Sequence, residues 1–214
     1  MSGNGYGESV NDDGYASNPD VMAIGASTNP DSSSYEDKAR YSDTGKAIFI
    51  CAPSSGGTKS ILTVDRLGKM GYNPRDRSTP DQVGNYTDVF GGTSSATPLV
   101  AGIAGLMLSV NPELTVDQVR DILRKTADKI GDKSTYTTDS SSNNGLSHSK
   151  LYGYGRINGL AAVTEAQKLV NKLSTANRSE EEKSDKNIDI HRTLIQSDDL
   201  VRQIDSSKWL SENL

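Results

Sequence analysis

The stretch that decides the fold is Gly-Gly-Thr-Ser-Ser-Ala-Thr-Pro-Leu-Val-Ala-Gly, residues 91–102. It places Ser94 in a turn of small residues before an apolar segment, which we expect to be a helix from Pro98 to Val110. Gly92 lets the chain bend tightly, and Pro98 suits a first helical turn, where its missing N–H would be unpaired in any case. Unpaired backbone N–H groups at a helix start favour negative charge. The stretch predicts a serine nucleophile beside an oxyanion site; a glycine-rich turn before a core helix would explain only Gly92 and Pro98.

A serine hydroxyl reacts only when a base takes its proton, and that base is usually a histidine oriented by an acid. The chain has two histidines, His148 and His191, and both follow Ser94. We expect that neither is the base; the alternative is that His148 has been recruited as an unusual one. The chain therefore reads as the second half of a catalytic domain.

The composition argues against several partners. The net charge of −5 over 214 residues disfavours nucleic acid and anionic membranes. No apolar run approaches transmembrane length, so we expect no membrane span. The start, Met-Ser-Gly-Asn-Gly-Tyr-Gly, lacks the basic and apolar parts of a signal peptide. Either missing sequence directs export, or the reading frame is truncated.

Strands and helices alternate along the chain, which predicts an α/β layered domain with a mostly parallel sheet. The apolar runs 21–26 and 48–52 predict strands that are covered on both faces, and 61–64 predicts a weaker strand. Cys51 lies in one of these runs, so we expect a buried, inert thiol. Residues 65–88 read as an irregular loop. The helix from residue 98 to 110 carries small and apolar residues all round and should be buried.

Two later helices have clear start signals. Thr115 and Gln118 form a capping-box pattern before apolar residues that recur up to Ile130. A polar loop at 132–147 follows, and Asn158 is the expected N-cap of a helix that ends near Leu173.

The chain changes character after residue 173. Residues 174–187 have almost nothing to bury and predict a charged linker, and 188–214 form a tail with helical potential. The expected domains are a partial catalytic domain over 1–173, the linker and the tail.

Residues 91–98 resemble the Gly-Thr-Ser-x-Ala-x-Pro signature of subtilisin-like serine proteases. Ser2-Gly3-Asn4-Gly5 and Asp13-Gly14-Tyr15 resemble the segment that holds their oxyanion asparagine, and the order of motifs over about 1–172 is most similar to the kexin and furin branch. The resemblance implies a three-layer subtilisin-like α/β fold with a mostly parallel sheet, whose N-terminal half, with the catalytic Asp and His, is missing. It also implies a secreted or extracytoplasmic protein.

The resemblance also implies residue roles. Ser94 would be the nucleophile and one oxyanion donor through its backbone N–H, with the Asn4 side chain as the other donor. Asn4 alone could equally be a turn asparagine between two glycines. Gly3 would contact substrate. Asp13 would lie in the S1 pocket and pair with a basic P1 side chain; the alternative is a carboxylate in an exposed turn.

Asp43 matches a calcium ligand of the family, with Asp12 or Glu8 as companions, because hard oxygen ligands suit Ca²⁺. Calcium would be structural, and the chemistry itself would need no cofactor.

The expected function is therefore a serine endopeptidase that cleaves protein or peptide substrates through an acyl-enzyme on Ser94, with a preference for basic residues. The chain alone should be nearly inactive without the missing N-terminal half. The alternative is a non-catalytic pseudoprotease or interaction fragment.

Overall fold

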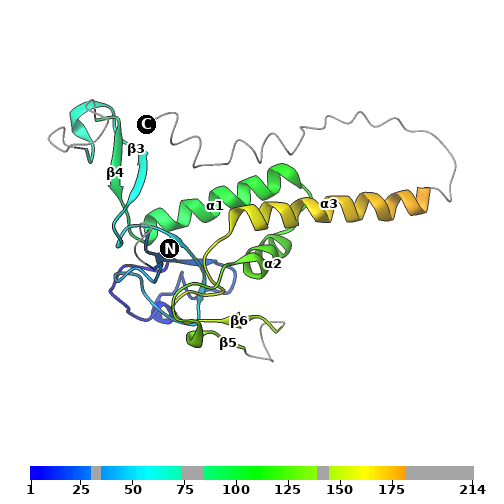
Figure 1. Cartoon of the computed structure of the whole chain (residues 1–214), viewed down its shortest axis with the longest axis horizontal. Helices are drawn as coiled ribbons and strands as arrows, with labels where there is room; N and C mark the ends of the chain where they lie inside the picture. The colour runs from blue at the N-terminus through cyan, green and yellow to red at the C-terminus, as the bar shows by residue number, and fades with distance from the viewer. Residues whose placement is uncertain (30–34, 74–83, 139–144, 182–214) are drawn as a thin grey trace. The chain divides into compact units, whose positions relative to one another are not determined.

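The computed structural model of the chain describes residues 1–29, 35–73, 84–138 and 145–181 (Figure 1). The chain divides into two compact units, residues 1–167 and 168–214. The first unit contains all the strands named below and the candidate site. The predicted tail at 188–214 lies outside the described residues.

A parallel strand pair lies at the centre of the first unit. β1 (Ala23–Ser27) runs beside β2 (Ile48–Pro53), in a register that pairs Ala23 with Ile48 and Ser27 with Pro53. Every residue of β1 is buried, as are the first five of β2. Both predicted strands are thus confirmed. Cys51 is buried as expected, and burial raises the pKa of its thiol.

Helix α1 (Thr93–Val110) packs on both of these strands. It begins five residues earlier than expected, so the prediction that Pro98 lies in the first helical turn is wrong. Pro98 lies in the second turn, where it has no N–H to donate to the Ser94 carbonyl. Ser94 itself is the second residue of the helix, so the nucleophile turn and the helix are one element.

The outer face of α1 is exposed, and the prediction of a helix buried on all sides is wrong. Leu99 and Leu108 are 38% and 41% exposed, and Gly102 and Gly105 lie on the surface. Within the described residues only one face of the helix finds a partner layer. By length and composition α1 is also able to cross a bilayer, which corrects the expectation that no apolar run approaches that length. Core helices of soluble proteins pass the same test.

Two antiparallel strand pairs complete the strands among the described residues. β3 (Ile61–Val64) pairs with β4 (Tyr86–Phe90), and β5 (Thr137–Thr138) pairs with β6 (Ser147–His148). The predicted loops at 65–88 and 132–147 are therefore wrong where β4, β5 and β6 form. Short 3₁₀ turns occur at η1 (Val10–Asp12), η2 (Gly68–Met70) and η3 (Lys133–Thr135). The α/β class is confirmed. Among the named strands of the described residues, β1 and β2 form the parallel pair, and isolated parallel bridges join Ser9 to Thr44 and Cys51 to Arg156.

Helix α2 (Val116–Thr126) has the predicted capping box: the Thr115 side chain accepts the Gln118 N–H, and the Gln118 side chain accepts the Thr115 N–H. The helix ends at Thr126 rather than near residue 130. The backbones of Asp128 and Arg156 exchange two hydrogen bonds of 2.8 Å, which draw the chain out of the helix.

Helix α3 (Gly159–Glu181) starts as predicted, because the Asn158 side chain accepts the Ala161 N–H over 3.0 Å. It continues to Glu181, beyond the expected end near Leu173 and into the segment expected to be a linker. Its first turns contact the end of α1, where the Asn111 amide donates to the Ala166 carbonyl over 3.2 Å (Figure 1).

Candidate active site

Ser94 lies exposed at the N-terminus of α1. Its hydroxyl donates to the Met1 sulfur over 3.4 Å. The Ser95 N–H donates back to the Gly92 carbonyl over 3.1 Å, which tightens the first turn around the serine. The unpaired N–H groups of a helix start are the donors that an oxyanion needs. The geometry thus offers an exposed hydroxyl at the positive end of a helix.

The Asn4 side chain is anchored to this helix start. Its Oδ1 accepts the Thr93 backbone N–H over 3.0 Å and the Thr93 hydroxyl over 3.1 Å. A backbone N–H can only donate, so the atom that it faces must be the amide oxygen. The orientation of the amide is therefore fixed, and Nδ2 is left as the donor end. Nδ2 makes no hydrogen bond to the described part of the chain.

Gly92 and Gly3 bring these two segments close together. Gly92 has a φ of 79°, and a Cβ there would lie 3.3 Å from the Asn4 Nδ2. Gly3 has a φ of 106°, and a Cβ there would collide with the Asp43 carboxylate. Its carbonyl accepts the Thr93 hydroxyl over 3.3 Å. Glycine is required at both positions by backbone conformation and by space.

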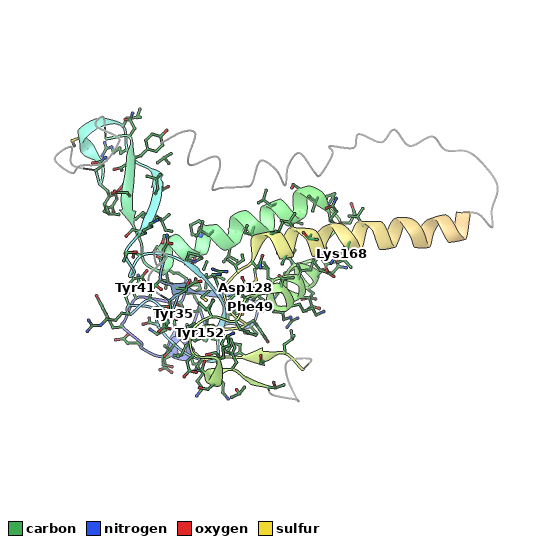
Figure 2. The ribbon with its side chains drawn as sticks, in the orientation of Figure 1. Tyr35, Tyr41, Phe49, Asp128, Tyr152 and Lys168 are labelled. Carbon is green, nitrogen blue, oxygen red and sulfur yellow. The ribbon has the colours of Figure 1, made fainter. Side chains whose placement is uncertain are left out.

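A chain of hydroxyl groups ties the nucleophile turn to the end of β2. The Ser54 hydroxyl lies 2.8 Å from the Gly92 carbonyl and 2.6 Å from the Ser95 hydroxyl. The Tyr41 hydroxyl, labelled in Figure 2, donates to the Ser54 Oγ over 2.8 Å. Sequence reasoning missed Tyr41, Ser54 and Ser95, because scattered hydroxyl residues give no signal until the fold places them together.

His148 lies at the other end of β2. Its Nε2 is 2.7 Å from the carbonyl of Ile48, which begins β2, whereas Ser54, which contacts the nucleophile turn, follows the end of that strand. Six residues of strand span about 20 Å. Direct proton transfer needs a contact of about 3 Å. This arrangement opposes the hypothesis that His148 is an unusual base; His191 lies outside the described residues.

Asp13 is exposed and forms a local turn. Its Oδ1 accepts the N–H groups of Tyr15 and Ala16 over 2.8 and 3.0 Å. The bond from Ala16, followed by that from Tyr15, lowers the pKa of the Asp13 carboxyl. The carboxylate is thus held in one position and ionised at neutral pH, which is compatible with a turn residue and with a substrate anchor.

Asp43 is buried, and its Oδ1 accepts the Gly7 N–H over 3.3 Å. The nearby Lys38 ammonium donates to the Ser42 carbonyl over 2.9 Å, and burial lowers its pKa while the charges of Asp37 and Asp43 oppose that shift. The described residues hold no group of three or more acidic, histidine or cysteine side chains suited to a metal. A cation at Asp43 would therefore need further ligands of other kinds, such as backbone carbonyls or water.

The fold is of the α/β class, and it places an exposed helix-start serine next to Thr93, the residue that the Asn4 amide binds. Residues 2–155 match the Subtilase family, and the chain belongs to that family.

Its relatives are proteases of several kinds. The chain is 44% identical over 166 residues to a calcium-dependent protease of Trichormus variabilis. This alignment covers 76% of the chain and 23% of the relative. It is 31% identical to kexin of Candida albicans, in an alignment that covers 79% of this chain and 16% of kexin. The crystal structure of the Aeromonas sobria serine protease matches with a TM-score of 0.63 at 26% identity, over 79% of this chain and 36% of that one. The chain thus spans less than a quarter of the length of these two curated relatives.

Proposed function

We propose that this chain is the nucleophile-bearing half of a serine endopeptidase that hydrolyses peptide bonds through an acyl-enzyme on Ser94. The observation that supports it most strongly is the pair of hydrogen bonds from Thr93 to the Asn4 Oδ1, between residues 89 apart in sequence. They hold an amide donor beside the exposed serine. A turn asparagine with only a local role would not need this long-range anchor.

In the proposed reaction the Ser94 oxygen attacks the substrate carbonyl, and its proton passes to a histidine base. The carbonyl oxygen becomes an oxyanion, which accepts hydrogen bonds from the Ser94 N–H and the Asn4 Nδ2. Each such donor contributes about 3–4 kcal/mol to stabilising the transition state. The protonated base then gives its proton to the leaving amine, and water hydrolyses the acyl-enzyme.

In this proposal the histidine and its acid belong to the N-terminal half of the domain, which is not part of residues 1–214. The outer face of α1 is the surface that such a segment would cover, because Leu99 and Leu108 are exposed there. The edge of β1 is already lined by this chain, because the Ser2 N–H donates to the Ile24 carbonyl over 2.9 Å.

Three finer assignments belong to the same proposal. Asp13, with Gly3 beside the site, selects a basic P1 residue in protein or peptide substrates. Asp43 contributes to a structural calcium site, in keeping with a relative named calcium-dependent protease. The protein works outside the cytoplasm, as the relative named Aeromonas extracellular serine protease does by its name.

Reconstitution tests the proposal. The full chain is combined with a separate polypeptide that carries the acid and histidine half of a related subtilase, and the mixture is treated with a fluorophosphonate probe. We expect labelling at Ser94, located by mass spectrometry, only when both polypeptides are present, and none in a Ser94→Ala variant. If the two polypeptides associate but Ser94 stays unlabelled, the chain is a non-catalytic member of the family.

A further inference from the structure

A cavity of about 890 Å³ lies where β1 and β2 begin. Its walls come from the segment before β1, the start of β2, one side of α2, and the β5 and β6 region. None of its lining residues belongs to α1 or to the segment that carries Asn4. The cavity is therefore separate from Ser94 and Asn4, which lie near the opposite end of β2. Its nearest link to the candidate site is Ala16, a lining residue whose N–H donates to Asp13.

The floor of the cavity is apolar and well packed. Phe49, labelled in Figure 2, and Tyr154 are buried and meet edge to face with their ring centres 5.6 Å apart. Ile48 and Leu151 line the same space. His148 closes one side as a neutral ring, because burial lowers its pKa. Such a floor suits an apolar side chain.

The rim of the cavity is positively charged. Lys46, Arg120, Arg124 and Lys150 line it, and no Asp or Glu is among the lining residues that the structure describes. Lys46 and Lys150 are exposed and form no ion pair with the described residues. This cluster occurs in a chain whose net charge is −5.

The two arginines differ in how much charge they leave available. Arg120 has no carboxylate partner in the described part of the chain: it donates to the Pro19 carbonyl over 2.7 Å and lies 5.6 Å from the centre of the Phe49 ring. Arg124 pairs with Asp121, which offsets its charge, but its buried Nε has no hydrogen-bond partner there. Lys46, Arg120 and Lys150 therefore carry the uncompensated charge.

We propose that this cavity binds an acidic peptide segment, with an apolar side chain on the Phe49 floor and carboxylates at the cationic rim. The volume lies near the upper end of the usual range for ligand sites, about 300–1,000 Å³. The cations come from three segments of the chain rather than from one anion-binding turn. A peptide with carboxylates on either side of an apolar residue matches this arrangement of charge and floor.

Fluorescence anisotropy with the full chain tests the proposal. The probe is a fluorescein-labelled peptide that alternates Glu with Phe, and the comparison peptide has Gln in place of every Glu. We expect the Glu peptide to bind at least about tenfold more tightly than the Gln peptide, and its affinity to fall as salt rises, because the attraction is between exposed charges. Equal binding of the two peptides would overturn the proposal.

Variants locate the binding. Lys46→Glu with Lys150→Glu should weaken the Glu peptide at least about tenfold, and the milder Lys46→Gln with Lys150→Gln should fall between that variant and the natural chain. The matched control is Lys59→Glu with Arg66→Glu, which makes the same charge change at two exposed residues outside the cavity. Equal losses in the rim and control variants would show attraction to net charge alone and refute the site. Thermal unfolding of each variant confirms that it is folded.

Discussion

The backbone N–H of Thr93 donates to the side-chain oxygen of Asn4 over 3.0 Å, so that the amide of Asn4 closes the start of α1. The Oδ1 and Nδ2 atoms of this amide have different roles. The oxygen satisfies a helix N–H that would otherwise be unpaired, and the nitrogen is left for the proposed oxyanion. Stability and catalysis at this position can therefore be separated by substitution.

Asn4→Asp keeps the oxygen and removes the N–H₂ donor, whereas Asn4→Ala removes both. We expect kcat of the reconstituted protease to fall by at least about 10²-fold in both variants. Only Asn4→Ala should also destabilise the chain, by about 1 kcal/mol, because the Thr93 N–H loses its acceptor. Urea unfolding and steady-state kinetics measure the two effects. A normal kcat in Asn4→Asp would show that Asn4 has only the structural task.

Gly92→Ala should destabilise the chain by about 1–2 kcal/mol, because alanine at a φ of 79° is strained and its Cβ would press on the Asn4 amide. Gly102→Ala, inside the helix that Gly92 precedes, is the control. A Cβ at Gly102 meets no other atom within 4 Å, so this change should stabilise the chain by about 0.5–1 kcal/mol. Chemical denaturation of both variants provides the comparison, and shifts of the same sign would contradict it.

Asp13→Asn should reduce the preference of the reconstituted protease for Arg over Leu at P1 by at least about tenfold in kcat/KM. Asparagine keeps the Oδ1 that accepts the Tyr15 and Ala16 N–H groups, so the turn is preserved while the charge is lost. The exposed neighbour Asp12→Asn is the control. An unchanged Arg-to-Leu ratio in Asp13→Asn would leave Asp13 as a turn residue only.

The stability of the chain should fall as the pH drops below about 6.5. Burial lowers the pKa of His148, so the folded state binds fewer protons than the unfolded state, and the linkage relation makes stability rise with pH in that window. His148→Gln should flatten the dependence, and His191→Gln is the control. Urea unfolding at pH 7.5 and pH 5.5 measures the difference. An equal slope in the natural chain and in His148→Gln would rule His148 out as its source.

Added calcium should raise the melting temperature of the chain, and Asp43→Asn should remove most of that rise. Asp43 is a buried carboxylate, so its charge interacts strongly with a nearby cation. Asp117→Asn, at an exposed position away from the residues named as calcium ligands, should keep the full rise. Calorimetry with calcium and with chelator measures the shift. If Asp43→Asn shows the full calcium-dependent rise in melting temperature, calcium does not bind at Asp43.

Short sequence patterns predicted the strands and helices that are determined by neighbouring residues. The unbroken apolar runs identified β1 and β2, and the Thr115 and Gln118 pattern identified the start of α2. The end of α2 was not predictable in this way. It depends on the backbone pairing of Asp128 with Arg156, a contact that no short window contains.

The candidate site divides in the same manner. Ser94 was recognisable from its neighbours, and Asn4 only from a family resemblance, because its partner Thr93 is 89 residues away. β4 was missed because four of its five residues are exposed, which removes the apolar pattern of a buried strand. The hydroxyl contacts of Ser54 arise from the packing of α1 on β2.

The exposed leucine face of α1 has a consequence for the life of the chain in a cell. Quality-control proteases and chaperones remove proteins that spend time with apolar surface uncovered. When residues 1–214 are produced alone, their lifetime in a cell should therefore depend on whether Leu99 and Leu108 are covered. A protein segment that buries this helix face would therefore protect the chain from degradation, in addition to any part that it has in peptide-bond cleavage.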